Sequence, residues 1–154
     1  DLASRQVVCW ALSKQPNAQL AQDAMDNAIN RYHPNTGNLM FHSDQGTQYS
    51  SKTFIDYCNQ NNITQSMSRK GNCWDNAVME RFFRSLKTER LNYQSFANHY
   101  EVVQNVESYI YFYNYKRIHS AIGYVTPAQK MAELKKVAPL MPCSLHSSDT
   151  GAPA

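Results

Sequence analysis

The chain has 154 residues, 42% of them hydrophobic and 12% aromatic, which is enough for one ordinary globular domain with a real core and excludes a disordered chain. Its formal net charge of +3 permits nucleic-acid binding without arguing strongly for it. No run of 18 apolar residues occurs, so we expect no membrane-spanning helix. The four cysteines lie far apart and form no C-x-x-C pair, so we expect reduced thiols in a cytoplasmic protein rather than a zinc site or a disulfide framework.

The first half of the chain predicts strands separated by helices. Residues 6–12 are rich in β-branched and aromatic side chains and predict a β-strand. Residues 17–32 place apolar side chains at helical spacing and predict a helix with Asn17 as its N-cap. The next predicted elements are a strand over residues 39–43, a helix that starts at Ser50 or Ser51 and ends near residue 61, and a strand over residues 63–67.

The second half predicts helices joined by polar segments. Residues 68–76 contain Arg69, Lys70, a glycine and a tryptophan, which suits a loop that contacts DNA; a plain polar connector is the alternative. Further helices are predicted from near residue 76, over residues 97–115 and from the N-cap Thr126 to about residue 136. We therefore divide the chain into a folded part, residues 1–136, and a disordered tail rich in Pro, Ser and Ala, residues 137–154.

Two acidic residues stand where carboxylates can meet in space. Asp44 ends the strand at 39–43, and Glu80 lies inside the helix that starts near residue 76. At about 100° per residue, Arg84 and Lys87 share the helix face of Glu80, while the opposite face is apolar. Hard divalent cations need such oxygen ligands, so the pair is a candidate metal site. The alternative is an ordinary surface helix with an ion pair between Glu80 and Arg84.

Other polar residues near these acids have two interpretations each. His42 is a possible metal ligand, but a histidine beside a buried strand is more often a structural hydrogen-bonding group. Asp75 competes with Glu80 as a ligand, and we favour it as a cap of the following helix. Near residue 115 the aromatic side chains beside Arg117 and His119 could stack on bases, although an aromatic stripe at helical spacing is usually core. For Tyr109 and Tyr113 we favour core.

Four stretches of the sequence carry a family resemblance. They are HSDQGTQY at 42–49, SRKGNCWDNA at 68–77, ERFFRSLKTE at 80–89 and YNYKRIHSAIGYVTP at 113–127. Together they resemble the transposases of bacterial insertion sequences that have a retroviral-integrase-like catalytic core. The resemblance covers roughly residues 1–135, and several separate motifs in the right order make a chance match very improbable.

The resemblance implies an α/β fold of the ribonuclease-H-like (integrase catalytic core) type, with a five-stranded sheet ordered 3-2-1-4-5 and a helical carboxyl-terminal extension. In the family, three acids hold Mg²⁺ or Mn²⁺ for phosphodiester cleavage and strand transfer: an Asp on the first strand, an Asp ending the fourth, and a Glu on a later helix. Asp44 matches the second acid and Glu80 the third. Lys87 matches the basic residue that contacts DNA near the scissile phosphate. Further candidates for DNA contact are Arg84, Arg69, Lys70, Arg117 and His119.

The family's first acid has no match here. It lies upstream of the Asp-Leu-x-Ser-Arg segment with which this chain begins. We therefore expect an incomplete core that lacks the first two strands, a free edge on the strand before Asp44, and a chain that is inactive alone. Three functions stay open. The chain is the carboxyl-terminal part of a transposase core that acts on transposon ends and target DNA, a non-catalytic remnant that binds nucleic acid or intact transposase, or a structural module with no DNA role. Self-association fits the first two.

Overall fold

The computed structural model of the protein describes residues 1–69 and 73–137. The tail predicted to be disordered lies, apart from residue 137, outside the described residues. The elements in chain order are α1 (Ala18–Tyr32), η1 (Thr36–Asn38), β1 (Met40–Ser43), α2 (Thr47–Ser50), α3 (Lys52–Gln60), β2 (Thr64–Met67), η2 (Cys73–Asn76), α4 (Ala77–Glu89), η3 (Leu91–Tyr93), α5 (His99–Tyr115), η4 (Ser120–Ile122) and α6 (Pro127–Val137).

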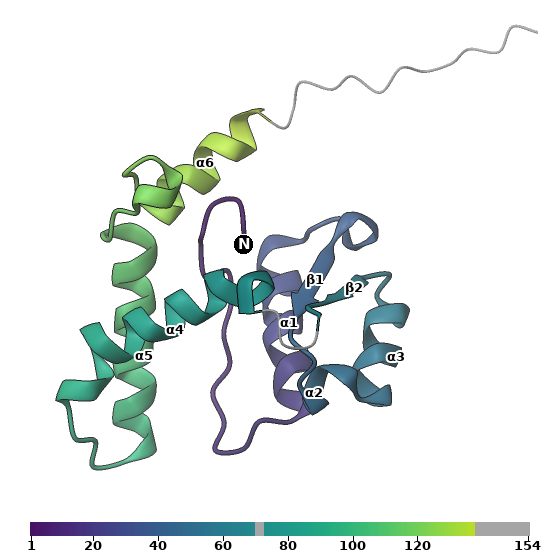
Figure 1. Ribbon diagram of the computed structural model, residues 1–154, viewed down its shortest axis with the longest axis horizontal. Helices are drawn as coiled ribbons and strands as arrows, with labels where there is room; N and C mark the ends of the chain where they lie inside the picture. The colour runs from purple at the N-terminus through teal and green to yellow at the C-terminus, as the bar shows by residue number, and fades with distance from the viewer. Residues whose placement is uncertain (70–72, 138–154) are drawn as a thin grey trace, which may run out of the picture.

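The sheet of the described residues consists of β1 and β2, which run parallel with Met40 opposite Thr64 and Ser43 opposite Met67. Parallel neighbours need a crossover connection, and α2 and α3 supply it. Both strands were predicted, each starting one residue earlier than observed. β1 has no strand on its other side within residues 1–69 and 73–137, so its outer edge is free, as expected. Figure 1 shows α1, α2 and α3 gathered around this sheet.

The strand predicted for residues 6–12 does not form, and that prediction is wrong. The segment has no regular secondary structure, because no strand of the described residues lies beside it to complete a ladder. One residue, Val7, is held by a side chain instead. Its N–H donates to Oδ1 of Asn114 (3.0 Å), and its carbonyl oxygen accepts from Nδ2 of the same amide (2.9 Å). The buried Asn114 of α5 thus takes the place of a neighbouring strand.

Local capping sets the starts of the helices largely as predicted. Asn17 accepts a hydrogen bond from the N–H three residues later, and so does Ser51, which caps α3 in preference to Ser50. Thr126 and Gln129 exchange reciprocal bonds at the start of α6, the capping box that their spacing predicts. Within the described part of the chain, no helix combines the length and the apolar character needed to cross a membrane.

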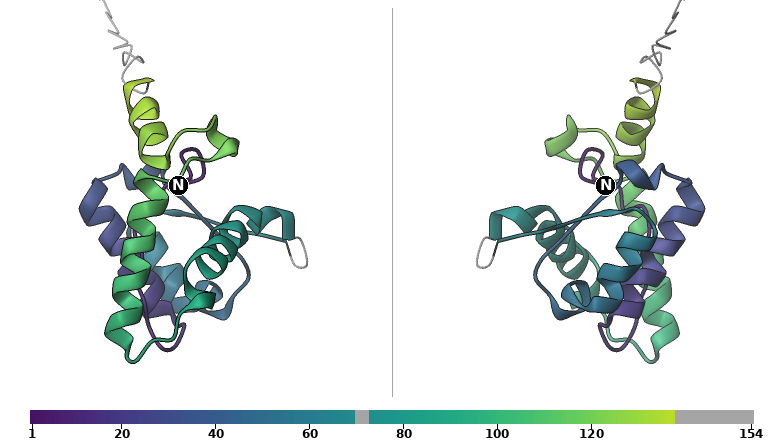
Figure 2. Two further views of the ribbon diagram at one scale, coloured as in Figure 1. Left: turned by 90° about the vertical axis from the view of Figure 1, so that its left-hand side faces the viewer. Right: turned by 90° about the vertical axis from the view of Figure 1, so that its right-hand side faces the viewer.

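Two apolar clusters hold the described residues together. The first contains Phe54, Cys58 and Ile63, and packs α1 and α3 against the sheet. The second contains Leu86 of α4 with Tyr109 and Tyr113 of α5. Tyr109 is only 1% exposed, so the prediction that these two tyrosines are core is confirmed. α4 crosses α5 at this second cluster, and α6 extends from one end of α5 (Figures 1 and 2).

An ionic network also ties the end of α4 to the segment after α5. The guanidinium of Arg117 donates to both carboxylate oxygens of Glu89, with the shortest bond, from Nη2 to Oε1, at 2.7 Å. The hydroxyl of Tyr109 donates to Oε2 of Glu89 (2.8 Å), and Arg117 also donates to Nδ1 of His119 (3.2 Å). The ring of His119 packs edge-on against Tyr113, with centroids 4.6 Å apart. The orientation of α4 is therefore set by paired charges as well as by apolar packing.

Asn114→Ala should destabilise the fold, because both backbone polar groups of Val7 lose their partner and the amide leaves a small void. We expect a loss of about 2 kcal/mol in the free energy of unfolding, the usual cost of leaving partly buried backbone groups unsatisfied. Urea denaturation measures this loss. Asn105→Ala is the matched control, because Asn105 is also on α5 but bonds only to the carbonyl of Glu101 within its own helix. Equal losses in the two variants would contradict the role given to Asn114.

Glu89→Gln should reduce the acid sensitivity of folding. The hydrogen bonds from Arg117 hold the pKa of Glu89 below the ordinary value of 4.5. A carboxyl whose pKa is lower in the folded state stabilises the fold above its unfolded pKa, and this stabilisation is lost as the pH falls through the folded pKa. The urea midpoint of the unchanged protein should therefore fall below pH 4.5, and that of Glu89→Gln should be lower at pH 7 and fall less on acidification.

The matched control for this pH experiment is Glu133→Gln. Glu133 pairs with Lys130 one helical turn away on the exposed side of α6. Such exposed pairs contribute little to stability, so this variant should keep the pH dependence of the unchanged protein. A Glu89→Gln variant with that same unchanged dependence would show that the Arg117 pair is not a determinant of acid stability.

Candidate metal and nucleic-acid site

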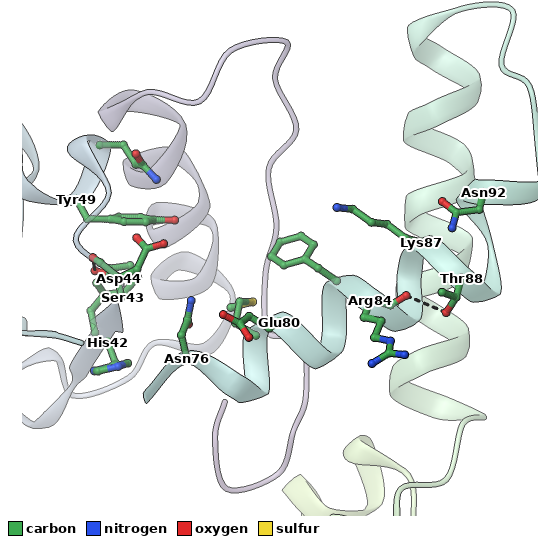
Figure 3. A pocket seen from close by; sticks show the side chains of 14 residues that line it. His42, Ser43, Asp44, Tyr49, Asn76, Glu80, Arg84, Lys87, Thr88 and Asn92 are labelled. Carbon is green, nitrogen blue, oxygen red and sulfur yellow. Dashed lines mark hydrogen bonds between the residues drawn. The ribbon is translucent and has the colours of Figure 1, made fainter. Parts of the chain in front are cut away.

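A cleft of about 630 Å³ lies between the end of β1 and the face of α4. Figure 3 shows the side chains that line it. They come from three parts of the chain: the strand end and α2 (residues 41–44, Gln48 and Tyr49), α4 and its start (Asn76, Met79, Glu80, Phe83, Arg84, Lys87 and Thr88), and η3 (Asn92). The structure thus brings four of the predicted site residues to one cleft, namely Asp44, Glu80, Arg84 and Lys87.

Asp44 stands directly after β1, with its side chain exposed at the cleft. Its Oδ1 accepts a hydrogen bond from the N–H of Gly46 (2.9 Å), which folds the carboxylate over the turn. A side chain at position 46 would crowd this arrangement. A Cβ there would lie 2.9 Å from Oδ1 of Asp44 and 2.7 Å from Nε2 of Gln48. The glycine therefore leaves the room that this carboxylate orientation needs.

Glu80 lies in the first turn of α4, where a carboxylate interacts favourably with the helix dipole. It is exposed, and it shares the cleft with Asp44. The alternative interpretation, an ion pair with Arg84 on a plain surface helix, is not what the structure shows: the ion pairs of the described residues do not include these two side chains. The basic side chains of Arg84 and Lys87 line the cleft instead (Figure 3).

His42 lies beside the acids but is bonded within the sheet. Its Nδ1 is 3.0 Å from the hydroxyl of Ser66 on β2, as the structural interpretation of this histidine requires. Its Nε2 is buried and has no hydrogen-bond partner among the described residues. Nowhere in residues 1–69 and 73–137 do three or more His, Cys, Asp or Glu side chains gather as a metal-binding group.

Asp75 does not act as the helix cap that we predicted. The N-cap of α4 is Asn76, and Asp75 lies in the preceding turn of 3₁₀-helix. Its Oδ2 accepts from the backbone N–H of Arg69 (3.3 Å) and lies 3.7 Å from Nε of the same residue. The carboxylate of Asp75 is therefore engaged by Arg69 and not by the first turn of α4.

Three of the remaining predicted DNA contacts, Arg69, Arg117 and His119, do not line the cleft. Arg69 is exposed and is paired with Asp75. Lys70 lies outside the described residues. Arg117 and His119 belong to the Glu89 network, where burial, together with the charge of Arg117, lowers the pKa of His119 and favours a neutral ring. DNA contact by these four residues stays a prediction.

Several cleft residues were not singled out from the sequence. Gln48, Tyr49, Asn76, Thr88 and Asn92 all line the cleft. For Asn76 a sequence signal existed: it stands four residues before Glu80 and thus one helical turn away on the same side. For Asn92 no such signal existed, because its place depends on how the chain turns after α4.

The comparison with known proteins agrees with the motifs. Two family models, each described as integrase core domain, match residues 1–73 and residues 61–127. The transposase for insertion sequence element IS904 of Lactococcus lactis is 40% identical over 128 residues, which cover 82% of this chain and 50% of that protein. The putative transposase InsK for insertion sequence element IS150 of Escherichia coli is 37% identical over 129 residues, or 84% of this chain and 45% of that protein. The chain spans about half the length of these curated relatives.

The comparison with solved structures concerns the fold. The crystal structure of the catalytic core domain of BIV integrase superposes with a TM-score of 0.62 at 24% identity, covering 82% of this chain and 78% of that one. This match confirms the predicted α/β fold of the ribonuclease-H-like, integrase-core type, with α5 and α6 as the helical carboxyl-terminal part. The chain belongs to the integrase core domain family, and its relatives there are transposases of bacterial insertion sequences.

Proposed function

We propose that this chain is the carboxyl-terminal part of the catalytic core of a bacterial DNA transposase, which cleaves and joins phosphodiester bonds at transposon ends with the help of a divalent cation. The observation that carries the proposal is the cleft itself. Asp44 and Glu80, which belong to different motifs, line it together with Arg84 and Lys87. Acids and cations in one open cleft suit a site that must hold both a metal ion and a phosphate backbone.

The donor set fits Mg²⁺ or Mn²⁺. Asp44 and Glu80 are exposed carboxylates, the hard oxygen ligands that these ions prefer. A bound cation supplies Lewis acidity toward a phosphoryl oxygen and lowers the pKa of an attacking water or hydroxyl. The chain's own part is to place the two acids: the hydrogen bond to Gly46 orients one, and the anchoring of α4 by the Glu89 network orients the other.

DNA is the partner that the basic side of the cleft suits. Arg84 and Lys87 are one and two turns beyond Glu80 on α4, so a phosphate backbone attracted by them would lie next to the acids. Association with a second copy or with intact transposase is a further part of the proposal. It is supported by the free edge of β1, which could accept another strand.

A second candidate function is that of a non-catalytic chain that binds DNA or intact transposase through the same surfaces. It is favoured by one observation: the described residues contain no group of three or more His, Cys, Asp or Glu side chains that could hold a metal ion. Metal binding by the chain separates the two candidates, because only the first requires it.

Calorimetric titration with Mn²⁺ tests the metal site. We expect one site that weakens about tenfold or more in Asp44→Asn and in Glu80→Gln, since each change removes one of two charged ligands and about 1.4 kcal/mol corresponds to tenfold. The asparagine can still accept the bond from Gly46, so the turn survives. Asp56→Asn, which removes an acid paired with Lys52 on α3, should bind Mn²⁺ like the unchanged chain. Undiminished binding by Asp44→Asn would remove the carboxylate pair from the proposal.

DNA titrations at several salt concentrations test the basic side of the cleft. Lys87→Ala should weaken binding to duplex DNA and reduce the slope of log K against log salt by about one, the value for a lost phosphate contact. Lys52→Ala is the control, because Lys52 is also exposed but lies on α3 and does not line the cleft. An unchanged slope in Lys87→Ala, or an equal change in both variants, would argue against a phosphate at this position.

A further inference from the structure

Asn76 is the N-cap residue of α4, yet its side chain makes no capping bond. The two other asparagines that cap α-helices among the described residues, Asn17 and Asn98, have extended backbones (φ −147°, ψ 172° and φ −157°, ψ 170°), and each accepts a bond from its helix. Asn76 has φ −112° and ψ 7°, outside the extended region that a capping side chain requires. The helix therefore leaves the amide of Asn76 unused.

This amide lies in the cleft with the two acids. Asn76 lines the same cleft as Asp44 and Glu80, and Figure 3 shows its side chain between theirs. Glu80 follows Asn76 by four residues, and side chains at this spacing on a helix have Cβ atoms about 5–6 Å apart. A single cation held by Glu80 is thus within reach of the Asn76 carbonyl.

Three other neutral side chains of the cleft, those of Ser43, Thr88 and Asn92, suit a cation less well than Asn76. The hydroxyl of Ser43 donates to the backbone carbonyl of Asp44 (3.0 Å). The hydroxyl of Thr88, two turns beyond Glu80, donates to the carbonyl of Arg84 (2.9 Å). Asn92 follows the end of α4, beyond the last turn of the helix. Asn76 makes no capping bond to α4 and lines the cleft together with both acids.

We infer that Asn76 is a third oxygen ligand of the cation site, its side-chain carbonyl acting with the carboxylates of Asp44 and Glu80. The inference rests on the proposed function, since it assigns a further residue to the same metal site. Amide carbonyls are regular ligands of hard cations and occur beside carboxylates in such sites. A neutral third ligand adds a donor atom without adding a third negative charge to the cleft.

Mn²⁺ binding by variants of the whole chain, followed by calorimetry and by the EPR signal of free Mn²⁺, tests the assignment. Asn76→Ala should weaken binding about threefold or more, because one donor atom is lost. Asn76→Asp, nearly isosteric, should tighten binding about tenfold, because a third carboxylate then faces the ion. Asn92→Asp is the matched control: the same change in the same cleft, but beyond the end of α4, should alter the affinity less than about twofold.

The outcomes separate this inference from the proposed function. Unchanged affinity in Asn76→Ala, with binding still lost in Asp44→Asn, would overturn the role of Asn76 and leave the two-acid site intact. If Asn76→Ala does not fold, Asn76→Asp decides alone, and an affinity equal to that of Asn92→Asp overturns the inference. No Mn²⁺ binding by the unchanged chain would overturn both, and binding by Asn76→Asp alone would then show only that position 76 lies near the acids.

Discussion

The position of α4 against α5 is the constraint on which the site depends. Glu80 faces the end of β1 only because the far end of its helix is fixed, by Leu86 in the second apolar cluster and by Glu89 in the ionic network. The carboxylate of Glu89 receives two groups from the α5 side, the guanidinium of Arg117 and the hydroxyl of Tyr109. A pair of this kind is directional, because a bidentate guanidinium fits a carboxylate in few orientations. Apolar packing alone would leave α4 freer to rotate about its axis.

The cleft lies where two separately packed regions meet. One region is the sheet with α1 and α3. Its apolar cluster around Phe54 packs against β1, the strand that precedes Asp44. The other region is α4 with α5, which pack together through the apolar cluster around Tyr109. Glu80 lies on α4. Between them the extended amino-terminal segment is pinned to α5 through Asn114 and Val7. The candidate site is therefore assembled from two regions, each of which has its own apolar cluster.

Structural features that depend on residues close together in the sequence could be predicted, whereas features that depend on distant residues could not. The cap at Asn17 and the capping box at Thr126 and Gln129 involve residues three positions apart, and both were predicted correctly. The face shared by Glu80, Arg84 and Lys87 follows from helix periodicity alone. The segment at 6–12 was predicted wrongly, because a strand exists only when a distant neighbour pairs with it.

Two further features could not be predicted from the sequence: the pairing of Glu89 with Arg117 and the absence of a capping bond from Asn76. The first joins residues 28 positions apart, and the second depends on a backbone angle that the residue type does not determine. For the site, sequence motifs could name Asp44 and Glu80 but not the neutral side chains around them. Neutral polar residues are common on all surfaces, so only their placement in space distinguishes a ligand from a solvated side chain.

The charged residues of the cleft contribute little to folding, and this separates function from stability in this protein. Asp44, Glu80 and Lys87 are exposed, and exposed charges interact weakly through water. The two acids repel each other only modestly at this exposure, and Arg84 and Lys87 in the same cleft offset part of the repulsion. The cores around Phe54 and Tyr109 carry the free energy of folding instead. Substitutions at the cleft can therefore test the proposed cation and DNA binding in a folded chain. Substitutions in the Glu89 network would change stability as well, because this network supports the helix that carries Glu80.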